Sequence, residues 1–257
     1  MGKHCSTWLT ITMTMTMTIT ITMTINTVCL GRPMNANKVS LDLYYESLCP
    51  YSATFIIHGL APIFDNGGII DIVDLSLYPW GNTNIRPDSS YACQHGLSDC
   101  LLNTVHACAI DAKPALTDHF PFIECVERLV HDHKHTQWET CFENSNFDPQ
   151  SVKECTFGQR GKELALKYAT ATASLKPPRE YVPWVVVDGE PLYEDYENFT
   201  NYVCKAYKGT LPSACTGESS GNFTREKTTP HSSPVCYADK LVPQTILPLV
   251  LSDQEAI

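Results

Sequence analysis

Cys49 is the residue of this chain that is best placed to do chemistry. It opens the run Cys49-Pro50-Tyr51-Ser52, which follows a strand-like segment and begins a segment with helical spacing. A thiol is a nucleophile only as the thiolate, and the unpaired N–H groups and positive dipole end at a helix N-terminus stabilise that anion. We therefore expect Cys49 to attack disulfide bonds, with Pro50 at the first helical position and Tyr51 shielding the sulfur.

A second segment has to present the substrate to that sulfur. Val182-Pro183 stands just before the apolar run Val185-Val186-Val187, and it is a candidate cis-proline loop opposite Cys49. About 5–6% of X–Pro bonds in folded proteins are cis, so the sequence alone does not decide the isomer. Pro183 joins Cys49 as a candidate active-site residue.

The elements that would position Cys49 can be followed along the chain. Residues 39–45 alternate in polarity and are rich in β-forming side chains, which predicts a strand. Residues 50–64 have helical spacing, with a kink or early end predicted at Pro62 and a stop at Asn66-Gly67-Gly68. Residues 69–77 form a second apolar run, which is typical of a buried parallel strand.

A long helical stretch separates this half from a second set of strand signals. Residues 91–175 turn helical, and the best single helix is 161–175. Strand character returns at 181–187, Asp188-Gly189 predicts a hairpin turn, and residues 194–207 have the spacing of an amphipathic helix. The order predicts an α/β, thioredoxin-like fold with a disulfide-rich helical insertion between the β-α-β half and the β-hairpin-α half.

The same patterns divide the chain into five parts. These are a leader (1–31), a thioredoxin-like N-terminal part (39–90), a helical Cys-rich insertion (91–176), a thioredoxin-like C-terminal part (177–215) and a tail (216–257). The tail loses periodicity and gains Ser, Thr, Pro and Gly, so we expect it to be mostly disordered.

Composition narrows the classes of protein. The 257-residue chain has a formal net charge of -10 and no Lys/Arg cluster, which argues against a nucleic-acid binder. Its 12 cysteines, without paired C-x-x-C units, argue against both a cytosolic protein and a zinc module. Asn198 and Asn222 each begin an Asn-Phe-Thr sequon and are candidate N-glycosylation sites, so we expect passage through the secretory pathway.

The cysteines also predict a disulfide framework. Those of the insertion can pair among themselves, in a connectivity that the sequence does not decide: Cys93, Cys100, Cys108, Cys125, Cys141 and Cys155. Cys204 and Cys215 are close enough in sequence to close a small loop. Once the leader is removed, Cys49 and Cys236 remain, the second of them in the tail, and we expect Cys49 to be a free thiol.

The N-terminal segment has three interpretations. Residues 9–25 alternate Thr with Leu, Ile or Met, which is strand-like in period, but their position and the small residues Thr27-Val28-Cys29 favour a signal peptide. Met1-Gly2 also begins an N-myristoylation pattern, and a disordered low-complexity leader is the third interpretation. The stretch is too polar and too short to span a bilayer stably, so no membrane span is expected.

Residues 93–108 carry a motif that narrows the function. Cys93-Gln94-His95-Gly96-Leu97-Ser98-Asp99-Cys100-Leu101-Leu102-Asn103, with Cys108 five positions on, resembles the pattern C-Q-H-G-x-x-E-C-x-x-N-x-x-x-x-C of the gamma-interferon-inducible lysosomal thiol reductases. Every specified position matches except Asp99, and the resemblance covers residues 39–208. It implies a thioredoxin-like fold, a secreted, lysosomal or vacuolar location, and reduction of protein disulfides at acidic pH.

Ser52 departs from what this resemblance implies. A reductase of this type uses C-x-x-C, in which the first thiolate attacks and the second resolves the mixed disulfide. A hydroxyl cannot form a disulfide, so Cys49 has no partner within its own motif. We predict exchange on protein disulfides through this single nucleophilic cysteine, recycled by a small-molecule or protein thiol. A reductase with a distant resolving cysteine, and a redox-inactive thioredoxin-like glycoprotein that binds polypeptides, are the alternatives.

The other residues of the signature have a structural interpretation. We expect four of them to cap a helix and to satisfy backbone hydrogen-bonding groups: Gln94, His95, Asp99 and Asn103. The alternative is a catalytic one, in which His95 donates a proton.

A histidine cluster is interpreted in the same structural way. His131, His133 and His135 lack a third ligand at metal-site spacing, so we interpret them as a solvated face. Neither a metal nor a cofactor is predicted.

Overall fold

The computed structural model describes residues 5–11, 23–29, 37–65, 67–85, 91–217 and 234–238. The chain divides into two compact units, residues 1–37 with 208–210 and residues 38–207 with 211–257. The smaller unit contains an antiparallel pair of strands, β1 (Cys5–Ile11) and β2 (Met23–Cys29). The strand-like period of the N-terminal segment is therefore real over these residues, and its role as a leader stays a prediction.

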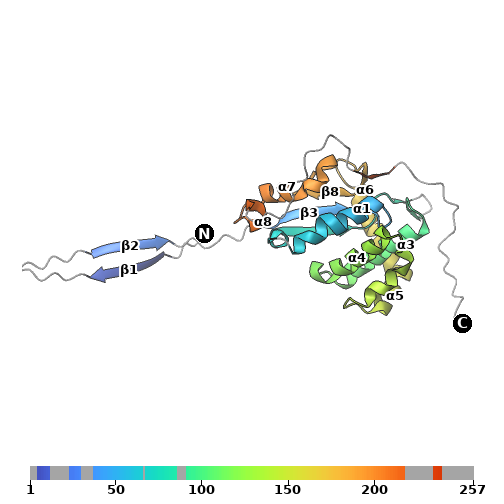
Figure 1. Cartoon of the computed structure of the whole chain (residues 1–257), viewed down its shortest axis with the longest axis horizontal. Coiled ribbons are helices and arrows are strands. Elements are labelled where there is room, and N and C mark those ends of the chain that lie inside the picture. Colours follow the sequence, from blue (N-terminus) through green and yellow to red (C-terminus); the bar gives the residue numbers. More distant parts are fainter. Residues whose placement is uncertain are drawn as a thin grey trace, which may run out of the picture. The chain divides into compact units, whose positions relative to one another are not determined.

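The larger unit is built on a four-stranded sheet with the order β4-β3-β8-β9 (Figure 1). Strand β3 (Val39–Tyr44) runs parallel to β4 (Val73–Tyr78) and antiparallel to β8 (Trp184–Val187). Strand β9 (Glu190–Pro191) returns after the turn at Asp188-Gly189. Both turn residues have a positive φ, of 48° and 84°, as a tight hairpin turn requires. The hairpin prediction is confirmed.

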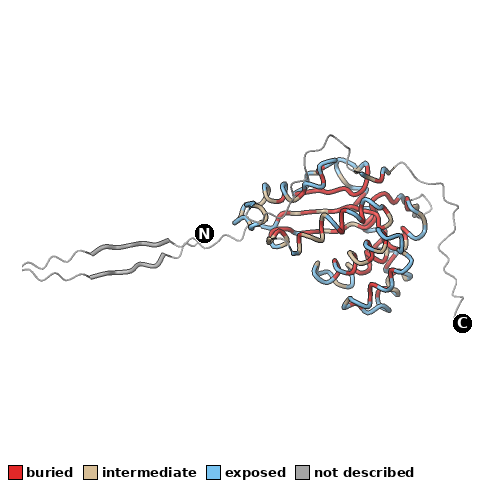
Figure 2. Tube along the Cα trace, viewed as in Figure 1, coloured by how far each residue is buried: buried red, intermediate tan, exposed pale blue. Residues whose placement is uncertain are grey.

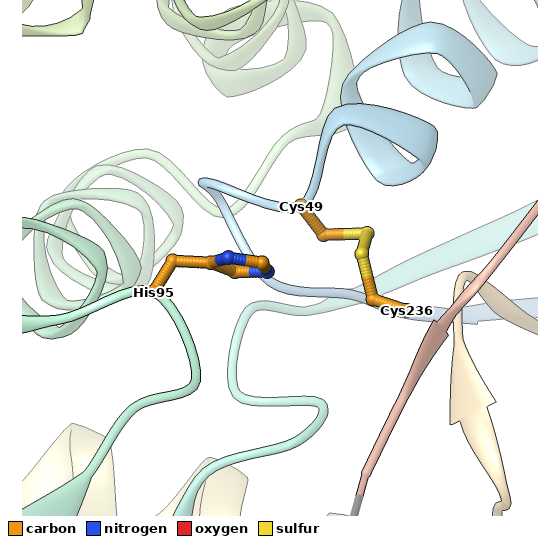
Figure 3. A group of neighbouring side chains, drawn as sticks. All are labelled: Cys49, His95 and Cys236. Atoms are coloured by element: carbon orange, nitrogen blue, oxygen red, sulfur yellow. A yellow bond between two sulfur atoms is a disulfide. The ribbon is translucent and has the colours of Figure 1, made fainter. Parts of the chain in front are cut away.

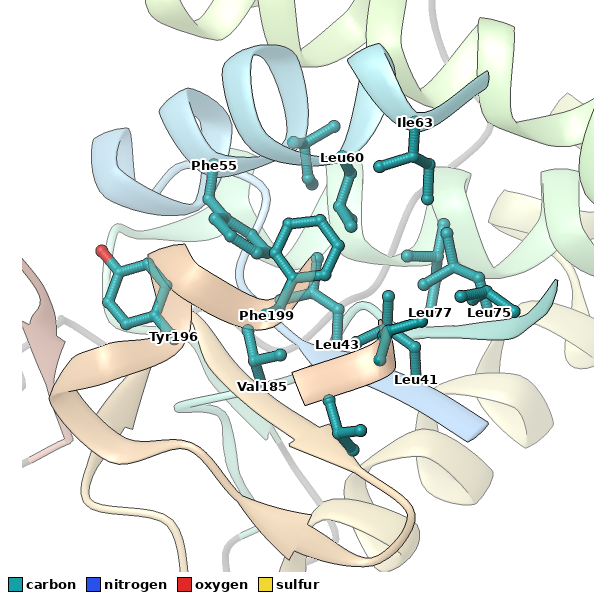
Figure 4. Packing of buried hydrophobic residues seen from close by; sticks show 14 of the residues in the cluster. Leu41, Leu43, Phe55, Leu60, Ile63, Leu75, Leu77, Val185, Tyr196 and Phe199 are labelled. Atoms are coloured by element: carbon teal, nitrogen blue, oxygen red, sulfur yellow. The ribbon is translucent and has the colours of Figure 1, made fainter. Parts of the chain in front are cut away.

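The main hydrophobic core lies on one face of this sheet. Strand alternation points Leu41 and Leu43 to that face, where both are fully buried. Figure 4 shows Phe55 and Leu60 of the helix after Cys49, together with Phe199, pointing toward these leucines. The strands and the inner sides of the helices are buried, and the outer sides of the insertion helices are exposed (Figure 2). The core thus fixes the helix that begins beside Cys49 against the sheet.

That helix changes character along its length. It runs as α1 (Pro50–Phe55), a π-helical turn (Ile56–Leu60) and a 3-10 segment (Ala61–Phe64), so it ends near Pro62 as expected. The following apolar run differs from the prediction, because its first residues form a short helix, α2 (Ile69–Ile72). Ile69 and Ile72 are spaced to share one face of a helical turn, and both are buried. The chain is therefore helical over these residues and becomes a strand only where β4 begins.

The insertion has its own core. Its helices are α3 (Leu97–Ala112), α4 (Leu116–His131), a 3-10 helix (His135–Phe142), α5 (Pro149–Phe157) and α6 (Gln159–Ala173). The six cysteines pair among themselves as predicted, and the connectivity is Cys93–Cys100, Cys108–Cys155 and Cys125–Cys141. These three disulfide bonds cross-link the helices of the insertion.

The C-terminal part contributes the remaining elements. They are β7 (Tyr181–Val182), a 3-10 helix (Tyr193–Asn198), α7 (Phe199–Ala206), α8 (Ser213–Thr216) and β10 (Cys236–Tyr237), and a short pair β5 (Asn84–Ile85) and β6 (Tyr91–Ala92) lies earlier in the chain. The predicted small loop is closed by Cys204–Cys215. The expectation of disorder after 216 is wrong at 234–238, because β10 pairs antiparallel with β7. Among the described residues, no helix is both long and apolar enough to cross a membrane.

Candidate active site

Cys49 lies at the junction that the sequence predicts. It is the N-cap residue of α1, with Pro50 at the first helical position. Its sulfur lies 3.8 Å from the carbonyl oxygen of Val182, and the Val182–Pro183 peptide bond is cis. The fold therefore brings Cys49 and the Pro183 loop together, as expected, although 133 residues separate Cys49 from Val182.

The state of Cys49 differs from the prediction, because its sulfur has a disulfide partner. Cys49 is bonded to Cys236, 187 residues away in sequence, with a Cα–Cα distance of 6.3 Å. The expectation that Cys49 is a free thiol is wrong in this structure. In the β10–β7 register Cys236 stands opposite Val182, and this pairing carries its sulfur to Cys49.

Ser52 occupies the place of the second cysteine of a C-x-x-C motif. Its side chain is fully buried, and its hydroxyl oxygen has no hydrogen-bond partner among the described atoms. The position therefore offers no sulfur to Cys49. The disulfide partner of Cys49 comes instead from β10, which carries Cys236 (Figure 3).

His95 is the side chain that faces this disulfide. Figure 3 shows its ring directed toward the two sulfurs, and the potential ligand atoms of Cys49, His95 and Cys236 all lie within 4.8 Å of one another. Burial lowers the pKa of His95, so the neutral imidazole persists to lower pH than in a free histidine. The two sulfurs are bonded to each other and offer no thiolate pair to a metal, so the arrangement suits proton transfer at sulfur.

Two signature residues hold the backbone that leads into Cys49. Asp99 accepts hydrogen bonds from the N–H groups of Leu48 and His95, each at 3.2 Å. Asn103 Oδ1 accepts from the N–H and the hydroxyl of Ser47, each at 2.9 Å. The expectation that these residues satisfy backbone groups is confirmed.

The capping part of that expectation is wrong. Helix α3 begins after Gly96, whose φ is 98°, and no side chain caps it. This backbone conformation favours glycine, so Gly96 serves the turn.

A second group of polar side chains contacts the strand that carries Cys236. Asn82 Nδ2 donates to the carbonyl oxygen of Cys236 at 2.8 Å and to Gln94 Oε1 at 2.7 Å. Gln94 Nε2 donates to the carbonyl oxygen of Tyr237 at 2.7 Å. Arg179 donates to Asn82 Oδ1 at 2.8 Å, which fixes the orientation of the Asn82 amide. The site thus holds the main chain of β10 as well as its sulfur.

Comparisons with known proteins agree with this geometry. The family model of gamma interferon inducible lysosomal thiol reductase matches residues 40–145. The gamma-interferon-responsive lysosomal thiol protein of Arabidopsis thaliana is 39% identical over 210 residues, which cover 80% of this chain and 86% of that protein. The chain belongs to the gamma interferon inducible lysosomal thiol reductase family.

A mouse member of the family and a solved structure extend the comparison. The gamma-interferon-inducible lysosomal thiol reductase of Mus musculus is 36% identical over 197 residues, or 73% of this chain and 77% of its own. BdbD from Bacillus subtilis, in its oxidised form, has a TM-score of 0.50 at 13% identity, over 68% of this chain and 95% of BdbD. The predicted thioredoxin-like fold is confirmed, and family membership makes this chain a thiol–disulfide oxidoreductase.

Behind Cys49, this member of the thiol reductase family buries several ionisable groups. Burial raises the pKa of Asp99 to about 7 and the pKa values of Glu46 and Glu127 well above their usual range. Burial lowers the pKa of His106 to about 3. The 3.7 Å contact between His106 and Glu127 therefore joins two neutral groups rather than an ion pair.

Sequence reasoning missed Glu46, His106, Glu127 and the Asn82–Arg179 pair, whereas it singled out Asp99 through the signature. His106 and Glu127 lie within apolar helix stretches and are fully buried. Polar residues on the apolar face of a predicted helix are a signal that could have found them. Asn82 and Arg179 lie outside the helices and strands, and their sequence carries no such signal.

The remaining predicted residues that the structure describes make no contact with the disulfide or with the site residues above: they are Asn198 and the histidines of the 131–135 cluster. Asn198 is exposed, and its side-chain amide donates to Asp195. Asn222 lies outside the described residues. His131 and His133 are exposed, and His131 lies 3.5 Å from Asp132.

Proposed function

We propose that this oxidoreductase exchanges the disulfide bonds of protein substrates through one nucleophilic cysteine, Cys49, in an acidic or secretory compartment. The Cys49–Cys236 disulfide is the observation that carries the proposal. It joins a sulfur at a helix start to a sulfur on an approaching strand, beside the Pro183 loop. A mixed disulfide with an extended substrate segment would have the same form.

The exchange follows from the chemistry of thiolates. The Cys49 thiolate attacks one sulfur of a substrate disulfide, the substrate S–S bond breaks, and the other sulfur leaves as a thiolate. A second thiolate then attacks the mixed disulfide and restores Cys49. That thiolate comes from the substrate, which gives isomerisation, or from a small-molecule or protein thiol, which is left in a disulfide with the substrate sulfur until a second such thiol reduces that bond.

A cycle with Cys236 as a distant resolving thiol is the second candidate. The Cys49–Cys236 bond favours it, because Ser52 supplies no sulfur inside the motif. In this cycle the Cys236 thiolate releases the reduced substrate and leaves the Cys49–Cys236 disulfide. Two external thiols would then reduce that bond.

The placement of His95 supports catalysis at mildly acidic pH. A lowered pKa leaves a larger fraction of the imidazole neutral there than in a free histidine, and that fraction can accept the proton of the Cys49 thiol and later give it to the departing sulfur. The buried acids with raised pKa values support the same compartment, because they favour the folded state when protonated. The two sequons and the disulfide framework fit passage through an oxidising compartment.

Trapping of mixed disulfides tests the proposal. The reduced full chain is mixed with a denatured, disulfide-containing protein at mildly acidic pH, quenched with acid and separated without reductant. Cys236→Ser should accumulate the mixed disulfide, and Cys49→Ser should form none. The Cys236→Ser variant is the matched control for the loss of one sulfur.

The outcomes separate the candidates. If Cys49→Ser traps substrate as well as the parent chain does, Cys49 is not the nucleophile. If the parent releases substrate quickly and Cys236→Ser holds it until a small thiol is added, Cys236 is the resolving thiol. If substrate binds without any covalent adduct and Cys49 is alkylated slowly, the chain is a redox-inactive polypeptide binder.

A further inference from the structure

Residues 234–238 occupy the site as an added strand. Cys236 pairs with Val182 and Tyr237 with Tyr181 in antiparallel register. The Ala238 N–H extends the ladder by donating to the carbonyl oxygen of Glu180 at 3.2 Å. These contacts use backbone groups, which any extended polypeptide offers.

Two buried side-chain amides also bind the main chain of this strand. Asn82 and Gln94 donate to the carbonyl oxygens of Cys236 and Tyr237, at 2.8 and 2.7 Å. Because Arg179 occupies Asn82 Oδ1 and Gln94 Oε1 accepts from Asn82, both NH₂ groups are turned toward the strand. Asn82 is fully buried and Gln94 nearly so. A vacant strand position would leave these donors without their carbonyl partners.

The flanking contacts define which side chains fit beside the cysteine. The hydroxyl of Tyr196 donates to the carbonyl oxygen of Pro234 at 3.0 Å. Val235 packs against the hydrophobic core, whereas Tyr237 stays largely exposed and meets the ring of Tyr181 edge-on at 5.8 Å. The position before the cysteine is thus apolar, and the position after it is open to water.

We propose that Asn82 and Gln94 form a binding site for the main chain of an extended, cysteine-bearing polypeptide, and that residues 234–238 are its resident occupant. An external substrate strand takes the same place, with its cysteine where Cys236 stands. This inference rests on the proposed function, because it assigns the substrate of the Cys49 thiolate.

The resident strand then controls access to the nucleophile. With β10 in place, Cys49 is 0% exposed, so a macromolecular disulfide cannot reach its sulfur. Reduction of the Cys49–Cys236 bond by two external thiols frees both sulfurs, but the hydrogen bonds to the strand remain. A substrate must therefore compete with β10 for Val182, Asn82 and Gln94.

Peptide disulfides test the binding site. The first probe is the end-blocked peptide Pro-Val-Cys-Tyr-Ala, and the second is a single end-blocked cysteine, each joined through its sulfur to the same aromatic thiol. The Cys49 thiolate attacks the cysteine sulfur, the S–S bond breaks, and the aromatic thiolate that leaves is measured by absorbance. In the full-length Cys236→Ser chain we expect the peptide to react about tenfold faster than the single cysteine.

Gln94→Met removes one donor to the main chain and should reduce that ratio severalfold. Gln137→Met makes the same change at an exposed site and should leave the ratio as it is. Equal rates for the two probes, or a ratio that Gln94→Met does not alter, would overturn the binding site. If neither probe reacts, even when Ala238→Pro is added to weaken the resident strand, the proposed role of Cys49 fails instead.

The resident occupant is tested in the same Cys236→Ser chain. Ala238→Pro removes the N–H that donates to Glu180, and Ala238→Gly keeps it. We expect Ala238→Pro to raise the rate with both probes severalfold relative to Ala238→Gly, because the strand leaves more often. Equal rates for the two variants would show that residues 234–238 do not cover the site.

Discussion

Asn103 accepts hydrogen bonds from both the backbone N–H and the hydroxyl of Ser47, two residues before Cys49. Each hydrogen bond reaches the amide oxygen of Asn103 at 2.9 Å, and both residues are fully buried. Asn103 belongs to the sequence signature on α3, so the insertion fixes the loop from which Cys49 projects. The signature therefore acts on the chemistry through backbone position.

Asn103→Ala should both destabilise the fold and slow the reaction of Cys49. The buried N–H of Ser47 loses its acceptor and the Ser47 hydroxyl keeps only its contact with His106 Nδ1, which costs about 1–3 kcal/mol in the free energy of unfolding. The loop then samples other positions, so exchange with a peptide disulfide slows. Asn201→Ala, at an exposed position, is the control for both readouts. A loss of stability without any change in the exchange rate would contradict a positioning role.

Ser52→Cys should restore a local disulfide. The hydroxyl of Ser52 is buried without a partner among the described atoms, so a thiol fits its surroundings at little cost. We expect peptide mapping of the oxidised variant to find Cys49 bonded to the introduced sulfur in place of Cys236, and insulin-type reduction assays to show faster turnover. A variant that keeps the Cys49–Cys236 bond and gains no turnover would show that the helix start does not admit a two-cysteine motif.

His95→Gln should slow exchange most at mildly acidic pH. Below the pKa of a free thiol, which is about 8.5, Cys49 needs a base to form the thiolate, and above it the thiolate forms without help. The lowered pKa of His95 leaves more of its imidazole neutral than in a free histidine, and the neutral ring can accept that proton. We expect a loss of about tenfold or more near pH 5 and a smaller loss near pH 9, measured as exchange rate against pH.

The control for this profile is His131→Gln, which changes an exposed imidazole. An equal loss at both pH values would assign His95 a structural role instead.

The free energy of unfolding should rise as the pH falls from about 8 to about 6.5. Burial raises the pKa of Asp99 from 3.8 to about 7, so the folded state holds a proton that the unfolded chain releases. Stability from this group is complete below the unfolded pKa and is lost as the pH rises through the folded pKa. His95, His106 and His119 have lowered pKa values and oppose the trend as the pH falls through their unfolded value of 6.5, where the unfolded chain gains protons that the folded state does not, so the interval ends there. Over this pH interval, the gain in the free energy of unfolding should be on the order of 1 kcal/mol.

Urea unfolding across this interval measures the effect. Asp99→Asn, which cannot titrate, should show a shallower dependence on pH than the parent chain. A free energy of unfolding that stays constant or falls between these two pH values would show that Asp99 ionises as readily in the folded state as in the unfolded chain.

Local patterns predicted the parts of the site that depend on neighbouring residues. The apolar alternation of 39–45 and the Pro50 start place Cys49 at a strand-to-helix junction, and Asp188-Gly189 gives the turn between β8 and β9. Periodicity failed where two templates overlap, as at Ile69–Ile72, where apolar residues suit a helical turn and a strand alike. Periodicity gave no signal for Asn82 and Arg179, because their contacts are with residues distant in sequence.

The sequence by itself determined the candidate nucleophile that we propose, the missing second cysteine at Ser52, the family signature and the order of the elements, because each is encoded within a few residues. Only the tertiary structure decided the partner of Cys49. Counting cysteines left Cys49 and Cys236 over and treated Cys49 as free. The bond between them depends on the register of a two-residue strand against β7, 187 residues from Cys49. Such pairing is set by backbone hydrogen bonds and buried amides, which composition and spacing do not encode.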